Sequence, residues 1–202
     1  MKKLTVLVMG VMICAGAALG DNGWGLVASH WDTKDADAGY GLGIKFSAEV
    51  VPNFMMDFRY TWFEDLGKPA PDLGITHYTL EVMPIELGVS ILSEPSNRII
   101  LFGGGGLGYY MMEGEMRTDN RSANRISADP DDEIGFYLNG GFEFVVSENT
   151  DSIQATRATL FLEAMYRSVN VKDIAVGDTL DLPVDNGNLD GLGVNLGFML
   201  RW

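Results

Sequence analysis

The sequence has little cysteine, histidine and positive charge. Cys14 is the single cysteine among 202 residues, and it lies in an N-terminal segment that we expect to be removed. From residue 21 onward the chain therefore has no thiol for a disulfide or a thiolate metal site. Lysine and arginine number 14 against 28 aspartate and glutamate residues, a formal net charge of −14. Because nucleic acids bind proteins through clustered bases, this balance excludes a nucleic-acid partner.

Long hydrophobic runs are missing beyond the N-terminal segment, which excludes a protein that crosses a membrane with helices. Residues 1–20 begin with two lysines near the N-terminus, continue with an apolar stretch and end in small residues, as a secretory signal peptide does. A transmembrane anchor is disfavoured because the apolar stretch is short and contains glycines. We predict cleavage after Gly20, which leaves one exported domain of residues 21–202.

Beyond residue 20 the sequence alternates with a period of two, which is the repeat of a β-strand. From Phe54 to Trp62 the even positions are apolar or aromatic, whereas Asp57, Arg59 and Thr61 lie between them. The last predicted strand alternates in the same way up to Trp202. Eight strands are predicted, in residues 24–31, 39–50, 53–65, 76–92, 99–112, 133–145, 157–167 and 190–202.

Pro84 interrupts the predicted strand of residues 76–92, and the alternation changes phase there. A proline cannot donate a hydrogen bond to a β-ladder, so we expect a β-bulge near this residue. With this phase change, both Glu81 and Glu86 would lie on the polar face of the strand.

The connections between the predicted strands alternate in length. Short turns at residues 51–53, 93–98 and 147–156 alternate with longer polar segments. Short turns at one end and long loops at the other are typical of an outer-membrane barrel, and aromatic residues at both ends of the strands favour a bilayer. We therefore predict an all-β, eight-stranded antiparallel up-and-down transmembrane β-barrel. A soluble lipocalin-like barrel is disfavoured because the polar faces carry glycine and small polar residues rather than dense charge.

Two segments carry a family resemblance: the glycine-rich run LFGGGGLGYY and the ending LGFMLRW. With them, the chain resembles the small eight-stranded outer-membrane β-barrel superfamily that includes OmpX and the transmembrane domain of OmpA. The resemblance implies an outer-membrane location, contact with outer-membrane lipid, and recognition of the C-terminal strand by the outer-membrane assembly machinery. The positions that match this assembly signal are Leu196, Phe198, Leu200 and Trp202.

The polar faces of the predicted strands carry ten ionisable residues that we expect to point into the barrel lumen. Unpaired charges in a closed interior are unfavourable, so we predict that the four bases pair with neighbouring carboxylates. Because six acids face four bases, one or two acids would be protonated, near water or near a mouth. This arrangement favours a lumen filled by side chains, with a narrow gated pore as the alternative. The predicted set is Lys45, Glu49, Asp57, Arg59, Glu81, Glu86, Glu143, Glu163, Arg167 and Arg201.

Motifs for catalysis or cofactor binding are weak. No GxSxG motif occurs, and only His30 and His77 could act as histidine bases. His77, Thr79 and Glu81 would share one strand face, but we expect His77 to be a polar residue at the membrane interface. The glycines of residues 103–108 match GxGxxG without the helix that a dinucleotide site needs. We therefore predict no catalytic residue, no cofactor and no metal.

The long loops are where recognition would take place. Arg117, Arg121 and Arg125 recur every four residues, and in a helix they would form one face suited to lipopolysaccharide phosphates. A solvated loop is the simpler interpretation of this segment. The loop of residues 172–190 is acidic and would attract divalent cations diffusely. We expect a monomer with a structural or surface-interaction role; the alternatives are a narrow channel, a lipid-modifying barrel enzyme and a soluble carrier.

Overall fold

The computed structural model describes most of the chain, some segments of it by their backbone alone. Among all the described residues, no helix is long and apolar enough to cross a membrane. The backbone is described for residues 21–34, 36–64, 66, 75–118, 125–149, 156–171, 174–176, 180–181 and 187–202. The side chains are left undescribed in the backbone segments 75–78, 115–118, 125–130, 174–176, 180–181 and at residue 187.

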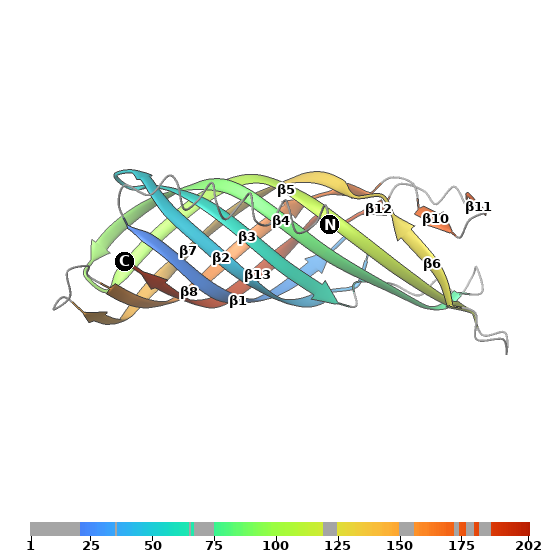
Figure 1. Ribbon diagram of the computed structural model, residues 1–202, viewed down its shortest axis with the longest axis horizontal. Coiled ribbons are helices and arrows are strands. Elements are labelled where there is room, and N and C mark those ends of the chain that lie inside the picture. Colours follow the sequence, from blue (N-terminus) through green and yellow to red (C-terminus); the bar gives the residue numbers. More distant parts are fainter. Residues whose placement is uncertain are drawn as a thin grey trace.

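Eight long strands form a closed antiparallel barrel, as the alternation predicts (Figure 1). Each strand pairs with the next one along the chain, and the pairing of β1 with β13 closes the ring. The fold prediction is therefore confirmed. The barrel strands are β1 (Asn22–Thr33), β2 (Gly39–Val51), β3 (Phe54–Glu64), β4 (Ile75–Ser96), β5 (Ile99–Thr118), β7 (Glu133–Asn149), β8 (Thr156–Ser168) and β13 (Gly191–Arg201).

Among the described residues, five short strands outside the eight predicted ones lie at the end of the barrel opposite both the tight β2–β3 turn and the C-terminus (Figure 1). β4 and β5 are the longest strands, with 22 and 20 residues, and they extend into this region. β6 pairs with the end of β5, β10 pairs with β6, and β11 pairs with β10. The short strands are β6 (Arg125–Pro130), β9 (Asn170–Val171), β10 (Ile174–Val176), β11 (Leu180–Asp181) and β12 (Gly187–Asn188).

The β-bulge predicted near Pro84 is wrong. The register between β4 and β5 runs without a shift from Thr79 to Ser93, and Pro84 lies opposite Tyr110 within it. The pairing of β4 with β3 is interrupted between Ile85 and Val82 but resumes in the same register. A proline removes one donor from the ladder without inserting a residue, so the faces of β4 do not exchange at this position.

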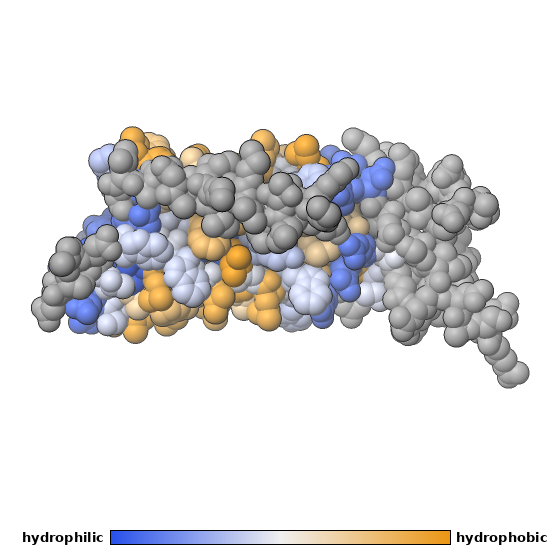
Figure 2. All heavy atoms as spheres, viewed as in Figure 1, coloured by the Kyte–Doolittle hydropathy of each residue, from blue (hydrophilic) through white to orange (hydrophobic). Residues whose placement is uncertain are grey.

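The outer face of the barrel is apolar, and the inner face carries the polar and small residues. Leu26, Leu42, Leu138 and Leu196 are exposed on the outside. Figure 2 shows the apolar residues in a band around the middle, with hydrophilic residues toward both ends. Exposed aromatic residues flank this band, a pattern typical of the two interfaces of a bilayer. We call the end with the five short strands the loop end, and the end with the β2–β3 turn the turn end. The exposed aromatic residues are Tyr40, Trp62, Tyr109, Phe136 and Tyr166 at the loop end, and Trp24, Phe54, Phe144 and Trp202 at the turn end.

Gly88 makes room for the buried ring of Tyr137 inside the barrel. A Cβ atom on Gly88 would collide with the hydroxyl of Tyr137 and would lie 2.5 Å from the carbonyl oxygen of Gly105. Because one of these neighbours is backbone, the clash cannot be relieved by a side-chain rotation alone. The glycine is required here by the close approach of a large side chain to the strand.

Gly88→Ala is expected to lower the free energy of unfolding by about 1–3 kcal/mol, the usual cost of overpacking. Gly103→Ala is the matched control, because its Cβ atom would have its nearest contact at 3.7 Å, from the carbonyl oxygen of Asn139. Urea unfolding of the refolded variants measures both. Equal stability of the two variants would contradict this account of Gly88.

Candidate functional site

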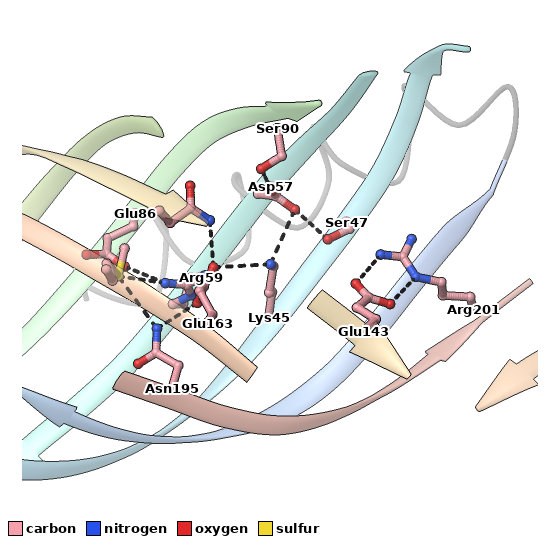
Figure 3. Close-up of polar contacts among 12 residues, drawn as sticks. Lys45, Ser47, Asp57, Arg59, Glu86, Ser90, Glu143, Glu163, Asn195 and Arg201 are labelled. Carbon is pink, nitrogen blue, oxygen red and sulfur yellow. Dashed lines mark hydrogen bonds and ion pairs between the residues drawn. The ribbon is translucent and has the colours of Figure 1, made fainter. Parts of the chain in front are cut away.

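The candidate site is the polar interior of the barrel, which we call the lumen network. Its eight ionisable side chains are contributed by β2, β3, β4, β7, β8 and β13, at strand positions that point inward, and none is more than 5% exposed. Four carboxylates face four cationic groups, so the network is neutral. Its ionisable members are Lys45, Asp57, Arg59, Glu86, Glu143, Glu163, Arg167 and Arg201. Figure 3 labels all of them except Arg167.

Glu163 on β8 accepts hydrogen bonds from three different side chains. Arg59 Nη2 donates to it at 2.8 Å, and the side-chain amides of Asn139 and Asn195 donate at 2.6 Å each. The ammonium of Lys45 lies 3.6 Å from Glu163 Oε1. The charge of this buried carboxylate is therefore matched by two cations and two amides.

Glu86 on β4 joins the network to the aromatic residues of the loop end. Arg167 Nε donates to Glu86 Oε1 at 2.8 Å, and the Tyr110 hydroxyl donates to the same oxygen at 3.2 Å. The guanidinium of Arg167 lies 5.1 Å from the ring centroid of Trp31 and 5.3 Å from that of Phe63. Cation–π contacts of this kind stabilise a desolvated cation.

Asp57 lies between β2 and β4, where the hydroxyls of Ser47 and Ser90 both donate to its carboxylate (Figure 3). Lys45 Nζ lies 3.9 Å from Asp57 and 4.7 Å from the centroid of the Phe102 ring. Lys45 therefore lies between Asp57 and Glu163 and connects them.

A separate ion pair occupies the turn end of the lumen. Arg201 binds Glu143 in a bidentate manner, with Nη2 at 2.6 Å from Oε1 and Nε at 2.9 Å from Oε2. The Thr159 hydroxyl also donates to Glu143, at 3.0 Å. Bidentate geometry of this kind is among the strongest that side chains form.

Two of the ten predicted lumen residues lie elsewhere. Glu81 faces outward, because β4 keeps its phase through Pro84, and Trp62 Nε1 donates to it at 3.4 Å. Glu49 lies at the turn end, where it accepts hydrogen bonds from the backbone N–H groups of Asp21 and Asn53. Their absence from the lumen removes the predicted excess of acids, so no protonated carboxylate is needed to balance the network.

An apolar cluster, which we call the apolar cap, occupies the loop end of the lumen, and the sequence analysis missed it. The inward faces of β1, β3, β4 and β5 are apolar near this end, where Trp31, Phe63 and Tyr110 are fully buried. The nearly uniform apolar character of residues 99–112 was the available signal. The cap consists of Trp31, Phe63, Leu66, Leu80, Val82, Tyr110, Met112, Val169, Val171 and Leu189.

The helix considered for Arg117, Arg121 and Arg125 does not form as one element. Arg117 lies in β5 and Arg125 in β6, where their backbones are directly paired. Arg121 and the side chains of the other two lie outside the described residues. The spacing of four residues therefore does not place these positions on one helical face.

The other residues considered for chemistry do not form a site among the described side chains. Thr79 and Glu81 occupy alternate positions of β4, and the side chain of His77 lies outside the described residues. No group of three or more potential metal ligands occurs among the described residues.

Asp190, in the predicted acidic loop, has a structural role. It accepts a hydrogen bond from the backbone N–H of Val169 at 2.9 Å, and its carbonyl oxygen accepts one from Lys34. Burial opposes ionisation of Asp190, but hydrogen bonds from Ser168, Asn188 and Val169 outweigh it and lower the pKa of the carboxyl. Asp173, Asp178 and Asp185 lie outside the described residues, as does the side chain of Asp181.

Comparison with known proteins identifies the family. The family described as the outer membrane protein β-barrel domain matches residues 6–201. The chain belongs to this family. It is therefore an outer-membrane β-barrel. No curated protein sequence matches the chain.

Solved structures with the same fold include other small outer-membrane proteins. OprG from Pseudomonas aeruginosa superimposes with a TM-score of 0.65 at 12% identity, covering 92% of this chain and 97% of OprG. Neisserial surface protein A gives a TM-score of 0.52 at 10% identity, covering 90% and 94%. The N-terminal barrel of OprF from Pseudomonas aeruginosa gives 0.51 at 8% identity, covering 90% and 97%. These similarities concern the fold of the outer-membrane barrel.

Proposed function

We propose that this outer-membrane barrel is a sealed anchor with a structural or surface-interaction role, and that it does not conduct solutes through its lumen. The observation that carries the proposal is the filling of the interior. Four buried carboxylates are matched by four buried cations, and the apolar cap follows the network toward the loop end. An ion could pass through such a lumen only if the charged side chains of the lumen network and the apolar cap were both displaced.

The extension of β4 and β5 supports a role in surface interaction. These strands continue past the end of β3, and β6, β10 and β11 add to the edge of β5 (Figure 1). The barrel thus presents a β-structure beyond the bilayer, where a partner or lipopolysaccharide would meet it. Arg117, Arg121 and Arg125 belong to this region of the sequence and are the candidates for phosphate contact.

The partners within the membrane follow from the outer face. Leu196 and Phe198 lie on the exposed face of the last strand, and Trp202, which follows it, is also exposed. This is the surface that the assembly machinery would read. Each of the eight described barrel strands pairs with a neighbour on both sides, so the closed ring itself offers a second copy no unpaired strand. We therefore expect a monomer.

Single-channel recording in planar bilayers tests the sealed lumen. The refolded wild-type barrel is expected to give no steady conductance, because the lumen network and the apolar cap exclude a continuous water path. A heat-dependent shift on an SDS gel, measured on the same preparation, establishes that the barrel is folded. Steady, reproducible conductance steps from such a preparation would reject the sealed anchor and favour a narrow channel.

A further inference from the structure

The first described residues are held at the seam where the barrel closes. The backbone of Asn22 exchanges two hydrogen bonds with Trp202, at 2.9 and 2.8 Å. Asp21 precedes this contact, and its side-chain Oδ2 lies 3.6 Å from Arg201 Nη1. The backbone nitrogen of Asp21 is therefore fixed relative to both the first and the last strand.

A carboxylate from a third strand, Glu49 of β2, faces this nitrogen. Asp21 N donates to Glu49 Oε2 at 3.1 Å, and Glu49 N donates back to the carbonyl oxygen of Asp21 at 3.0 Å. The other carboxylate oxygen of Glu49 accepts the N–H of Asn53 at 3.0 Å, which holds the side chain in place. An ordinary amide thus donates to an acceptor that is better suited to a cation.

We propose that hydrolysis of the peptide bond between Gly20 and Asp21 creates an α-ammonium that forms an ion pair with Glu49 and fastens the barrel seam. A protease of the signal-peptidase class would cleave at this bond, which follows the charged, apolar and small-residue segments of residues 1–20. Water supplies the hydroxyl to the carbonyl carbon of Gly20, and the C–N bond breaks. The amine of Asp21 takes up a proton at neutral pH and becomes the cation.

The charges around Asp21 favour this cation. The charged groups near the Asp21 nitrogen are the Asp21 carboxylate, Glu49 of β2, Glu143 of β7, Arg157 of β8 and Arg201 of β13. Three carboxylates thus face two guanidinium groups, and Arg157 also pairs with Glu94 and Glu148. Burial raises the pKa of the Asp21 carboxyl despite the opposing effect of Arg201. A new positive charge on the same residue offsets the local excess of negative charge.

The ion pair predicts a defined dependence of stability on pH. An α-amine titrates at a pKa of about 7.7–8.0 when it is unperturbed, and an adjacent carboxylate raises that pKa in the folded barrel. A group whose folded pKa is raised contributes its full stability below the unfolded pKa and loses it as the pH rises through the folded pKa. The contribution of Glu49 is therefore complete at pH 6 and is lost above pH 9.

Four exported proteins test this ion pair, which is independent of whether the lumen conducts. They are the wild type, Glu49→Gln, and the same two chains with one alanine inserted between Gly20 and Asp21. Intact mass gives the N-terminus of each processed protein, and urea unfolding at pH 6 and pH 10 gives its stability. The insertion keeps every barrel residue but moves the ammonium by one residue, while Glu49 still binds Asn53.

The expected result is a mature wild type that begins at Asp21. Its unfolding equilibrium constant should rise about tenfold more on Glu49→Gln at pH 6 than at pH 10, which corresponds to a pKa shift of about one unit. Between the two chains that carry the inserted alanine, the effect of Glu49→Gln should not depend on pH. A fifth protein, Glu94→Gln, which removes another carboxylate of the turn end, should show no such dependence. A mature chain that begins elsewhere, or a Glu49→Gln effect that is the same at both pH values, would overturn the proposal.

Discussion

Replacing Glu163 with alanine is expected to lower the free energy of unfolding by about 3–5 kcal/mol, the usual effect of breaking a buried ion pair. The substitution leaves Arg59 and Lys45 with a positive charge that water cannot reach, since neither is more than 3% exposed. The amides of Asn139 and Asn195 lose the acceptor of their 2.6 Å hydrogen bonds at the same time. Urea unfolding of the refolded barrel, followed by tryptophan fluorescence, measures the change.

Glu148→Ala is the matched control for Glu163→Ala. Glu148 pairs with Arg157 at 3.0 Å, but both side chains are about one-third exposed at the turn end. A pair that solvent screens contributes about 0–1 kcal/mol, so this variant should stay close to the wild type. If the two alanine variants lost the same small amount, the lumen charges would be hydrated, and the sealed interior would be wrong.

The faces of the strands could be predicted from the sequence because side chains alternate strictly in a β-strand. That periodicity places Lys45, Arg59 and Glu163 in the interior without any knowledge of their partners. It fails for Glu81, where Pro84 was interpreted as a change of phase. A proline that only removes a backbone hydrogen-bond donor and a proline at a β-bulge look alike in the sequence. Only the extra residue of a β-bulge moves the following side chains to the opposite face of the strand.

The pairing inside the lumen could not be predicted from the sequence. Arg59 and Glu163 are 104 residues apart, and which residues meet across the lumen depends on the tilt and stagger of all eight strands. The apolar cap was missed for a related reason. Trp31 and Phe63 follow the alternation of their strands, but on the inward face, where the pattern predicted polar residues.

Arg201→Met is expected to lower the free energy of unfolding by about 3–5 kcal/mol, whereas Arg201→Met combined with Glu143→Leu should recover most of that loss. The single variant leaves the Glu143 carboxylate buried, with the Thr159 hydroxyl, at 3.0 Å, as the remaining hydrogen-bond donor among the described side chains. The double variant removes both charges and fills the space with apolar side chains. Replacing a complete buried ion pair in this way is often neutral or stabilising.

A double-mutant cycle of the wild type, the two single variants and the double variant measures this coupling by urea unfolding. The pair is suited to a cycle because its two members bind each other directly, at 2.6 and 2.9 Å. Arg201 also lies 3.6 Å from Asp21, so the recovery should be incomplete by the small contribution of that partly exposed contact. Additive losses in the double variant would show that the two side chains are not coupled. A recovery would mean that the charges of this pair are tolerated in the lumen only when they are matched. Removing one partner then destabilises the barrel, whereas replacing both partners with apolar side chains does not.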